Sequence, residues 1–157
     1  MTVTAIRIIC CILYGAASVS DEREMKIPRL ISYLECLSAF LCWCIRFLTD
    51  REFSVGNLVV SLGFLGIFFA FYRKGQIGLG DVFLVFSMLV LMSCGQQTMA
   101  LLWKENIFFC IAFFSAGVRL LVQRFGKKRE NAGGCPFAIH LFAAFLFVEM
   151  FPALPGK

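Results

Sequence analysis

Two aspartates stand at positions where this apolar chain changes character. Asp81 opens an apolar run, and the sequence Gly-Leu-Gly at 78–80 comes directly before it. Asp21 closely follows an earlier apolar run over residues 2–19. An acid at the end of a membrane helix is costly, and it is by default a candidate for function. Two carboxyl groups held close together share one proton, and such a pair can activate water for hydrolysis.

Each aspartate also has a simpler interpretation. Asp21 fits a solvated helix end, because the charged residues 22–24 follow it. Asp81 fits a helix N-cap, a position that aspartate favours. The sequence alone leaves these structural roles open beside the catalytic one.

The composition indicates an integral membrane protein. The chain has 157 residues, of which 60% are hydrophobic and 16% charged, and its mean hydropathy is +0.83. A soluble domain carries about a quarter charged residues. We therefore expect a single transmembrane domain over residues 1–157. The net charge of +5 lies mostly in short loops, which predicts contact with anionic lipid headgroups and no nucleic acid.

Six apolar runs predict the architecture. At about 1.5 Å per residue, each run just crosses a hydrocarbon core about 30 Å thick. We therefore predict an all-α polytopic bundle of six transmembrane helices, placed roughly at residues 2–19, 30–47, 56–72, 81–97, 99–122 and 135–151. Pro28 is expected at the start of the second helix.

Three details of these runs carry alternatives or further expectations. The first run also resembles a cleaved signal peptide, because Ala-Ala-Ser at 16–18 loosely suits a processing site. The boundary between the fourth and fifth runs is ambiguous, because Lys-Glu-Asn at 104–106 could form the turn instead. Gly63 and Gly66 in the third run are expected to allow a close helix contact.

The basic residues predict an orientation. With six crossings, ten of the 15 Lys and Arg residues lie on the side that holds the loops after the first, third and fifth helices. Lysine and arginine are enriched in cytoplasmic loops. Asp21 leaves the first helix and Asp81 enters the fourth, so both are expected at this cytoplasmic face. We predict a multi-pass protein of the plasma membrane with its site facing the cytoplasm.

Three segments carry a resemblance to a known family. Gly-Leu-Gly-Asp-Val at 78–82 matches the GxGD pattern of intramembrane-type aspartic proteases. Asp21, followed by Ile-Pro-Arg-Leu at 27–30, resembles the aspartate and Ile-Pro-Asn segment of type IV prepilin peptidases. Cys-Pro-Phe-Ala at 135–138 resembles the segment that opens the last helix of that family. GxGD alone is a weak pattern, but the three segments follow the family's order over nearly the whole chain.

This resemblance implies an aspartic endopeptidase that removes the leader peptide from type IV pilin-like precursors at the cytoplasmic face. Asp21 and Asp81 would be the catalytic pair, and Gly78, Gly80 and Pro28 would shape the backbone around the substrate. The resemblance implies no cofactor and no metal. The expected partners are prepilin-like membrane proteins and the lipid bilayer, and the oligomeric state is left open.

The chain departs from the family pattern at two positions. Phe83 stands where members usually have lysine, and Arg29 stands where asparagine often follows Ile-Pro. Neither change removes a catalytic group, but both affect the expected substrate contacts. The N-terminal zinc-binding and methyltransferase domain of the larger members is not expected here. The chain resembles the short, peptidase-only form of tight-adherence pilus or preflagellin systems.

Other polar residues in the apolar runs give weaker indications. Glu35 is expected to hydrogen-bond within the bundle or to reach the interface, His140 to pack with a satisfied ring, and Glu149 to be solvated. The eight cysteines include no CxxC pair, so they are interpreted as small buried hydrophobes. Two other function classes stay open, namely a small proton- or ion-coupled transporter or assembly component, and an inactive pilus-assembly scaffold.

Overall fold

The computed structural model describes residues 2–50, 55–75, 77–93, 98–125 and 136–150. Within these ranges the chain forms helices and short turns, and no strand. This confirms the predicted all-α class. The helices are α1 (Thr2–Glu24), α2 (Arg29–Asp50), α3 (Val55–Arg73), α4 (Leu79–Ser93), α5 (Thr98–Phe125) and α6 (Ala138–Met150).

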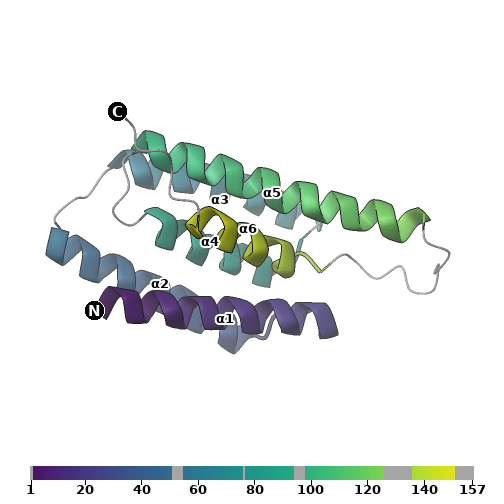
Figure 1. Cartoon of the computed structure of the whole chain (residues 1–157), viewed down its shortest axis with the longest axis horizontal. Coiled ribbons are helices and arrows are strands. Elements are labelled where there is room, and N and C mark those ends of the chain that lie inside the picture. Colours follow the sequence, from purple (N-terminus) through teal and green to yellow (C-terminus); the bar gives the residue numbers. More distant parts are fainter. Residues whose placement is uncertain (1, 51–54, 76, 94–97, 126–135, 151–157) are drawn as a thin grey trace.

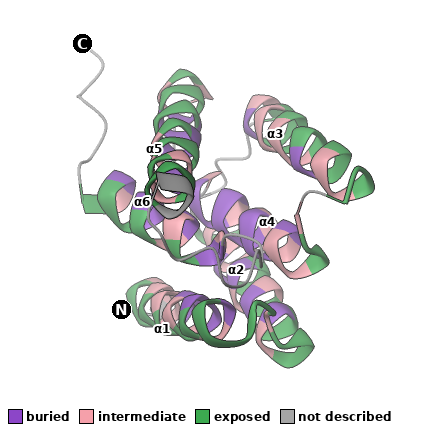
Figure 2. Cartoon of the chain, turned by 90° about the vertical axis from the view of Figure 1, so that its right-hand side faces the viewer, coloured by how far each residue is buried: buried purple, intermediate pink, exposed green. Residues whose placement is uncertain are grey.

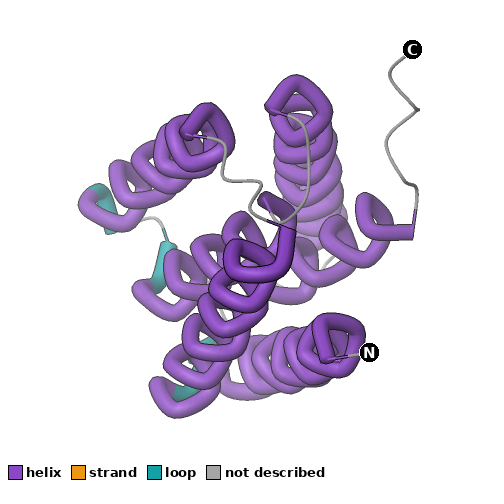
Figure 3. Tube along the Cα trace, turned by 90° about the vertical axis from the view of Figure 1, so that its left-hand side faces the viewer, coloured by secondary structure: helices purple, strands orange, loops and turns teal. Residues whose placement is uncertain are grey.

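The two shortest helices lie in the middle of the bundle. Figure 1 shows α4 and α6 between a lower pair, α1 and α2, and an upper pair, α3 and α5. Viewed from one end, α4 lies between α2 and α3, and α6 lies between α1 and α5 (Figure 2). Figure 3 shows the same bundle from the opposite end, with the described turn residues between α1 and α2 and between α3 and α4 in teal. Every outer helix therefore contacts at least one central helix.

The helix α4 has apolar residues all round, a pattern that suits either a protein interior or a lipid-facing span, and in this bundle it takes the interior position. Its buried residues are Val82, Leu84, Val85, Ser87, Met88, Leu89, Leu91 and Met92. By contrast, α3 buries only Asn57 and Phe68 and presents the rest of its surface outward.

Four helices are long and apolar enough to cross a membrane, namely Val3–Glu24, Arg29–Thr49, Val55–Arg73 and Thr98–Val122. The outer surface carries many large apolar side chains, including Leu30, Leu48 and Phe114. Such a surface suits a lipid environment. The helices α4 and α6 are shorter than a straight crossing requires. The described chain therefore contains a helix for each of the six predicted crossings, but only four of these helices are long enough to span a membrane.

Several predicted boundaries need correction. The helix α1 continues through the polar residues to Glu24, so Asp21 lies in its last turns and not in a loop. Lys104 to Asn106 lie inside α5, so the ambiguous triplet is not the turn. The expected close contact at Gly63 and Gly66 is wrong, because a Cβ at either position meets no atom of the described chain within 4 Å.

The first apolar run is part of the core. Cys10, Tyr14 and Ala17 on one face of α1 are fully buried. The Tyr14 ring packs edge-on against Phe145 of α6, with 5.3 Å between ring centroids. Residues 2–19 are thus packed into the domain, in contrast to the alternative that they form a removable signal peptide.

Candidate functional site

The Gly-Leu-Gly-Asp sequence forms the start of α4. The Gly78 carbonyl accepts the N–H of Val82 at 3.4 Å, as expected of an N-cap residue. The carboxylate of Asp81 reaches back, and its Oδ2 accepts the Gly78 N–H at 3.0 Å. This is the acidic half of a capping box, in which the third helical residue satisfies the N-cap N–H. The structure thus gives Asp81 a helix-terminal role and leaves its Oδ1 buried with no hydrogen-bond partner in the described ranges.

Gly80 joins the GxGD turn to the Ile-Pro segment. A Cβ placed on Gly80 would lie 2.9 Å from Cβ of Ile27, a separation that real Cβ atoms essentially never show. Only glycine therefore lets the start of α4 approach the chain reversal that precedes α2. Pro28 completes this reversal, because its carbonyl accepts the Ser32 N–H at 3.2 Å and so begins α2. Its place at the start of the second helix is confirmed.

Gly80→Ala is expected to destabilise the fold by about 1–3 kcal/mol, because the added methyl group overpacks the contact with Ile27. Thermal unfolding in detergent measures the change. Gly63→Ala is the matched control, because its Cβ meets open space and a helical Gly→Ala change stabilises by about 0.5–1 kcal/mol. A Gly80→Ala protein as stable as the wild type would show that the two segments do not pack so closely.

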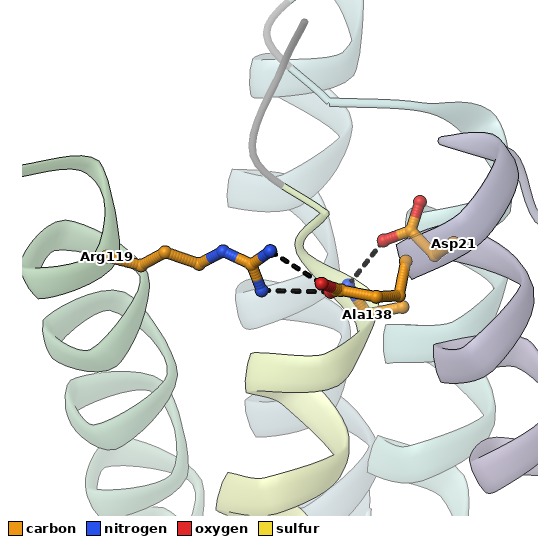
Figure 4. Close-up of polar contacts among 4 residues, drawn as sticks. Asp21, Arg119 and Ala138 are labelled. Atoms are coloured by element: carbon orange, nitrogen blue, oxygen red, sulfur yellow. Dashed lines mark hydrogen bonds and ion pairs between the residues drawn. The ribbon is translucent and has the colours of Figure 1, made fainter. Parts of the chain in front are cut away.

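Asp21 also has a structural partner, and it comes from the far end of the sequence. Its side chain is 7% exposed, and its Oδ2 accepts the Ala138 N–H at 3.0 Å (Figure 4). Ala138 is the first residue of α6, so its N–H is one of the helix-terminal donors that lack a partner within the helix. Asp21 therefore caps α6 from α1. The Pro-Phe segment before α6 is brought to the aspartate in this way.

The two aspartates lie at the same end of the bundle and act on each other. Ile27 follows Asp21 by six residues and contacts Gly80, the neighbour of Asp81. The pKa of Asp81 is raised to about 6, first by burial of its carboxyl group and second by the charge of Asp21. Asp81 therefore lies near enough to Asp21 to feel its charge, and each carboxylate also has a backbone N–H partner.

An ion pair beside Asp21 fixes the end of α1. The Arg119 guanidinium of α5 donates two hydrogen bonds to the Glu22 carboxylate, at 2.7 and 2.9 Å. Figure 4 shows that Arg119 points toward the region where Asp21 meets Ala138. This pair was not predicted, because its partners are 97 positions apart in the sequence and no local pattern relates them.

The remaining polar candidates have varied surroundings. His140 Nδ1 lies 3.0 Å from Ser115 Oγ, which confirms the expected satisfied packing histidine. Glu149 was expected to be solvated, but its Oε1 lies 2.7 Å from the Lys104 ammonium. Glu35 was expected to hydrogen-bond or to reach the interface, but it is fully buried and both carboxyl oxygens lack partners in the described ranges. No group of three His, Cys, Asp or Glu residues that could hold a metal occurs among the described residues.

Comparison with known proteins assigns this chain to no family and no function. No known family, curated protein or solved structure matches this chain. The function must therefore be argued from the residues themselves.

Proposed function

We propose that this protein is a membrane aspartic endopeptidase that cleaves the leader peptide of type IV prepilin-like or preflagellin-like precursors. The observation that supports the proposal most directly is the contact between Gly80 and Ile27, because it packs the two segments that follow Asp21 and precede Asp81, and that resemble the same family, against each other. The charge of Asp21, which contributes to the raised pKa of Asp81, agrees with this placement.

The proposed reaction needs one proton shared by the pair. The ionised carboxylate accepts a proton from a water molecule, and the resulting hydroxide attacks the scissile carbonyl carbon. The protonated carboxyl group donates to the carbonyl oxygen, and the leaving amine takes up a proton as the C–N bond breaks. The two carboxyl groups titrate as one unit, so acid and base roles belong to the pair.

In this proposal the site faces the cytoplasm, in a six-helix domain of the plasma membrane. The basic residues of the α1–α2 turn and the end of α3 lie at the same end of the chain's helices as the aspartates, in agreement with the orientation that positive charge favours. The Gly78–Gly80 backbone and Pro28 would line the approach of the extended substrate segment.

The test is cleavage of a type IV prepilin and a tight-adherence pilin precursor by membranes that contain this protein, with mass spectrometry of the product. Loss of the leader at one peptide bond, before the hydrophobic helix of the precursor, would support the proposal. A well-expressed protein that cleaves neither precursor nor a preflagellin would oppose it and would favour the transport or scaffold alternatives.

A further inference from the structure

Three side chains of α1 and α2 are among the buried groups whose polar atoms lack hydrogen-bond partners within the described residues. They are the Tyr14 hydroxyl, the Ser32 hydroxyl and both carboxyl oxygens of Glu35, and none finds a hydrogen bond in the described part of the chain. Tyr14 and Glu35 are fully buried and Ser32 is nearly so. A buried polar group without a hydrogen bond costs about 1–3 kcal/mol, and native proteins retain few of them.

The packing of α1 on α2 brings these groups together. The Cys10 thiol lies 3.4 Å from the Ser38 hydroxyl, which sets the register of the two antiparallel helices. One turn further along α1 is Tyr14, and the residue one turn back along α2 is Glu35. The same register continues to Ser32 on the same face of α2, because residues three apart are neighbours on a helix surface.

The helix α4 packs against the same polar groups from a third side. Tyr14 interacts electrostatically with Glu35 and lies within reach of Ser87, a fully buried residue of α4. The Cys36 thiol, next to Glu35, contacts the Phe83 carbonyl at 3.7 Å. Three helices therefore surround the polar atoms, and α4 also carries Asp81, whose Oδ1 is likewise buried without a partner among the described atoms.

Glu35 has no basic side chain to balance a charge, since none of the ion pairs between described residues includes it. An isolated ionised carboxylate in an apolar interior is far more costly than a neutral carboxylic acid. A neutral Glu35 has one O–H donor and acceptor oxygens, and each hydroxyl group can both donate and accept. These groups complement a small neutral molecule that both donates and accepts, which is water.

We propose that Tyr14, Ser32 and Glu35 form a binding site for buried water between α1, α2 and α4. A buried water typically makes about three hydrogen bonds to polar groups that otherwise lack partners. Tyr14 of α1 and Ser32 and Glu35 of α2 supply three such groups, and α4 closes the site on its third side. It lies two helical turns from Asp21 along α1, so it extends a polar path from the candidate site into an apolar bundle. The inference does not depend on the proposed peptidase activity.

The test is hydroxyl-radical footprinting of the full-length protein in lipid nanodiscs, in which radicals formed from bound water label adjacent side chains. Phe68 of α3 is the internal reference, because it is almost equally buried and its ring packs against the rings of Phe109, Phe113 and Phe137. We expect Tyr14 to be labelled several-fold faster than Phe68 after correction for intrinsic reactivity. Equal corrected rates in the wild type would show a dry interior and overturn the proposal.

Two variants at one position then test which groups hold the water. Glu35→Gln keeps the size and hydrogen-bonding capacity, so rapid labelling of Tyr14 is expected to persist. Glu35→Leu removes the hydrogen-bonding capacity, and labelling of Tyr14 is expected to fall to the Phe68 rate. Glu24→Leu, at an exposed position of α1, is the control. If Tyr14 is labelled in Glu35→Leu as fast as in the wild type, Glu35 does not hold the water, and faster labelling of Phe68 would reveal general unfolding.

Discussion

Asp21→Asn and Asp81→Asn are each expected to reduce precursor cleavage by about 10²- to 10⁴-fold, the usual contribution of a positioned acid or base. Asparagine can preserve the structural role of either residue. Its amide oxygen can accept the Ala138 N–H in place of Asp21, or the Gly78 N–H in place of Asp81. What asparagine cannot do is share or transfer a proton at neutral pH. Initial cleavage rates of a purified prepilin-type precursor measure the loss.

Two comparisons separate catalysis from capping. Glu24→Gln changes an exposed acid near Asp21 and is expected to leave the rate unchanged. Asp21→Ala removes the α6 cap and should lower stability by about 1 kcal/mol more than Asp21→Asn. Full activity of Asp21→Asn would limit that residue to capping α6, and it would remove the pair from the proposed mechanism.

The helices themselves were largely predictable from apolar runs, because a membrane helix needs about twenty apolar residues. The pattern failed at the end of α1, where Glu22 to Glu24 continue the helix because straight-chain residues have good helix propensity. The predicted fifth helix over 99–122 correctly contains Lys104, whose charge Glu149 stabilises from another helix, and the alternative turn at 104–106 does not form. The hydropathy of a sequence carries no information about an ion-pair partner that lies on a different helix.

The sequence predicted which segments contain the candidate site, but it did not predict the contacts that the side chains make there. Short patterns placed Asp21 and Asp81 at helix ends, which the structure bears out. The capping of α6 by Asp21 joins residues 117 apart in sequence, so it emerges only from the packing of α1 on α6. Glu35 was visible as an acid in an apolar run, but its lack of partners depends on side chains from α1 and α4.

The largest expected effect on stability concerns an ion pair away from the candidate site. Lys104 of α5 is 7% exposed, and its ammonium group lies 2.7 Å from the Glu149 carboxylate of α6. Arg7 of α1 approaches the other carboxylate oxygen at 3.7 Å. Arg7 and Asp21 are separated by about 21 Å along α1, so changes to this cluster leave the aspartates in place.

Glu149→Leu is expected to destabilise the protein by about 3–5 kcal/mol, because it leaves the Lys104 ammonium buried without its carboxylate. Lys104→Leu should have a smaller effect, since Glu149 keeps Arg7 as a partner. The double variant removes both the buried lysine and the partly exposed glutamate, and it is expected to recover most of the stability, because an apolar pair often replaces an ion pair in the interior without loss. Arg7, a third of whose side chain is exposed, can then extend toward the headgroups.

Denaturant unfolding of the two single variants and the double variant forms a thermodynamic cycle that isolates the pairwise free energy. Glu24→Leu, an exposed acid of α1, is the control and should change stability by no more than about 0.5 kcal/mol. If the double variant is no more stable than Glu149→Leu, the cost does not come from an unpaired lysine. The expected recovery would instead show that the cost of Glu149→Leu comes from leaving Lys104 buried and unpaired.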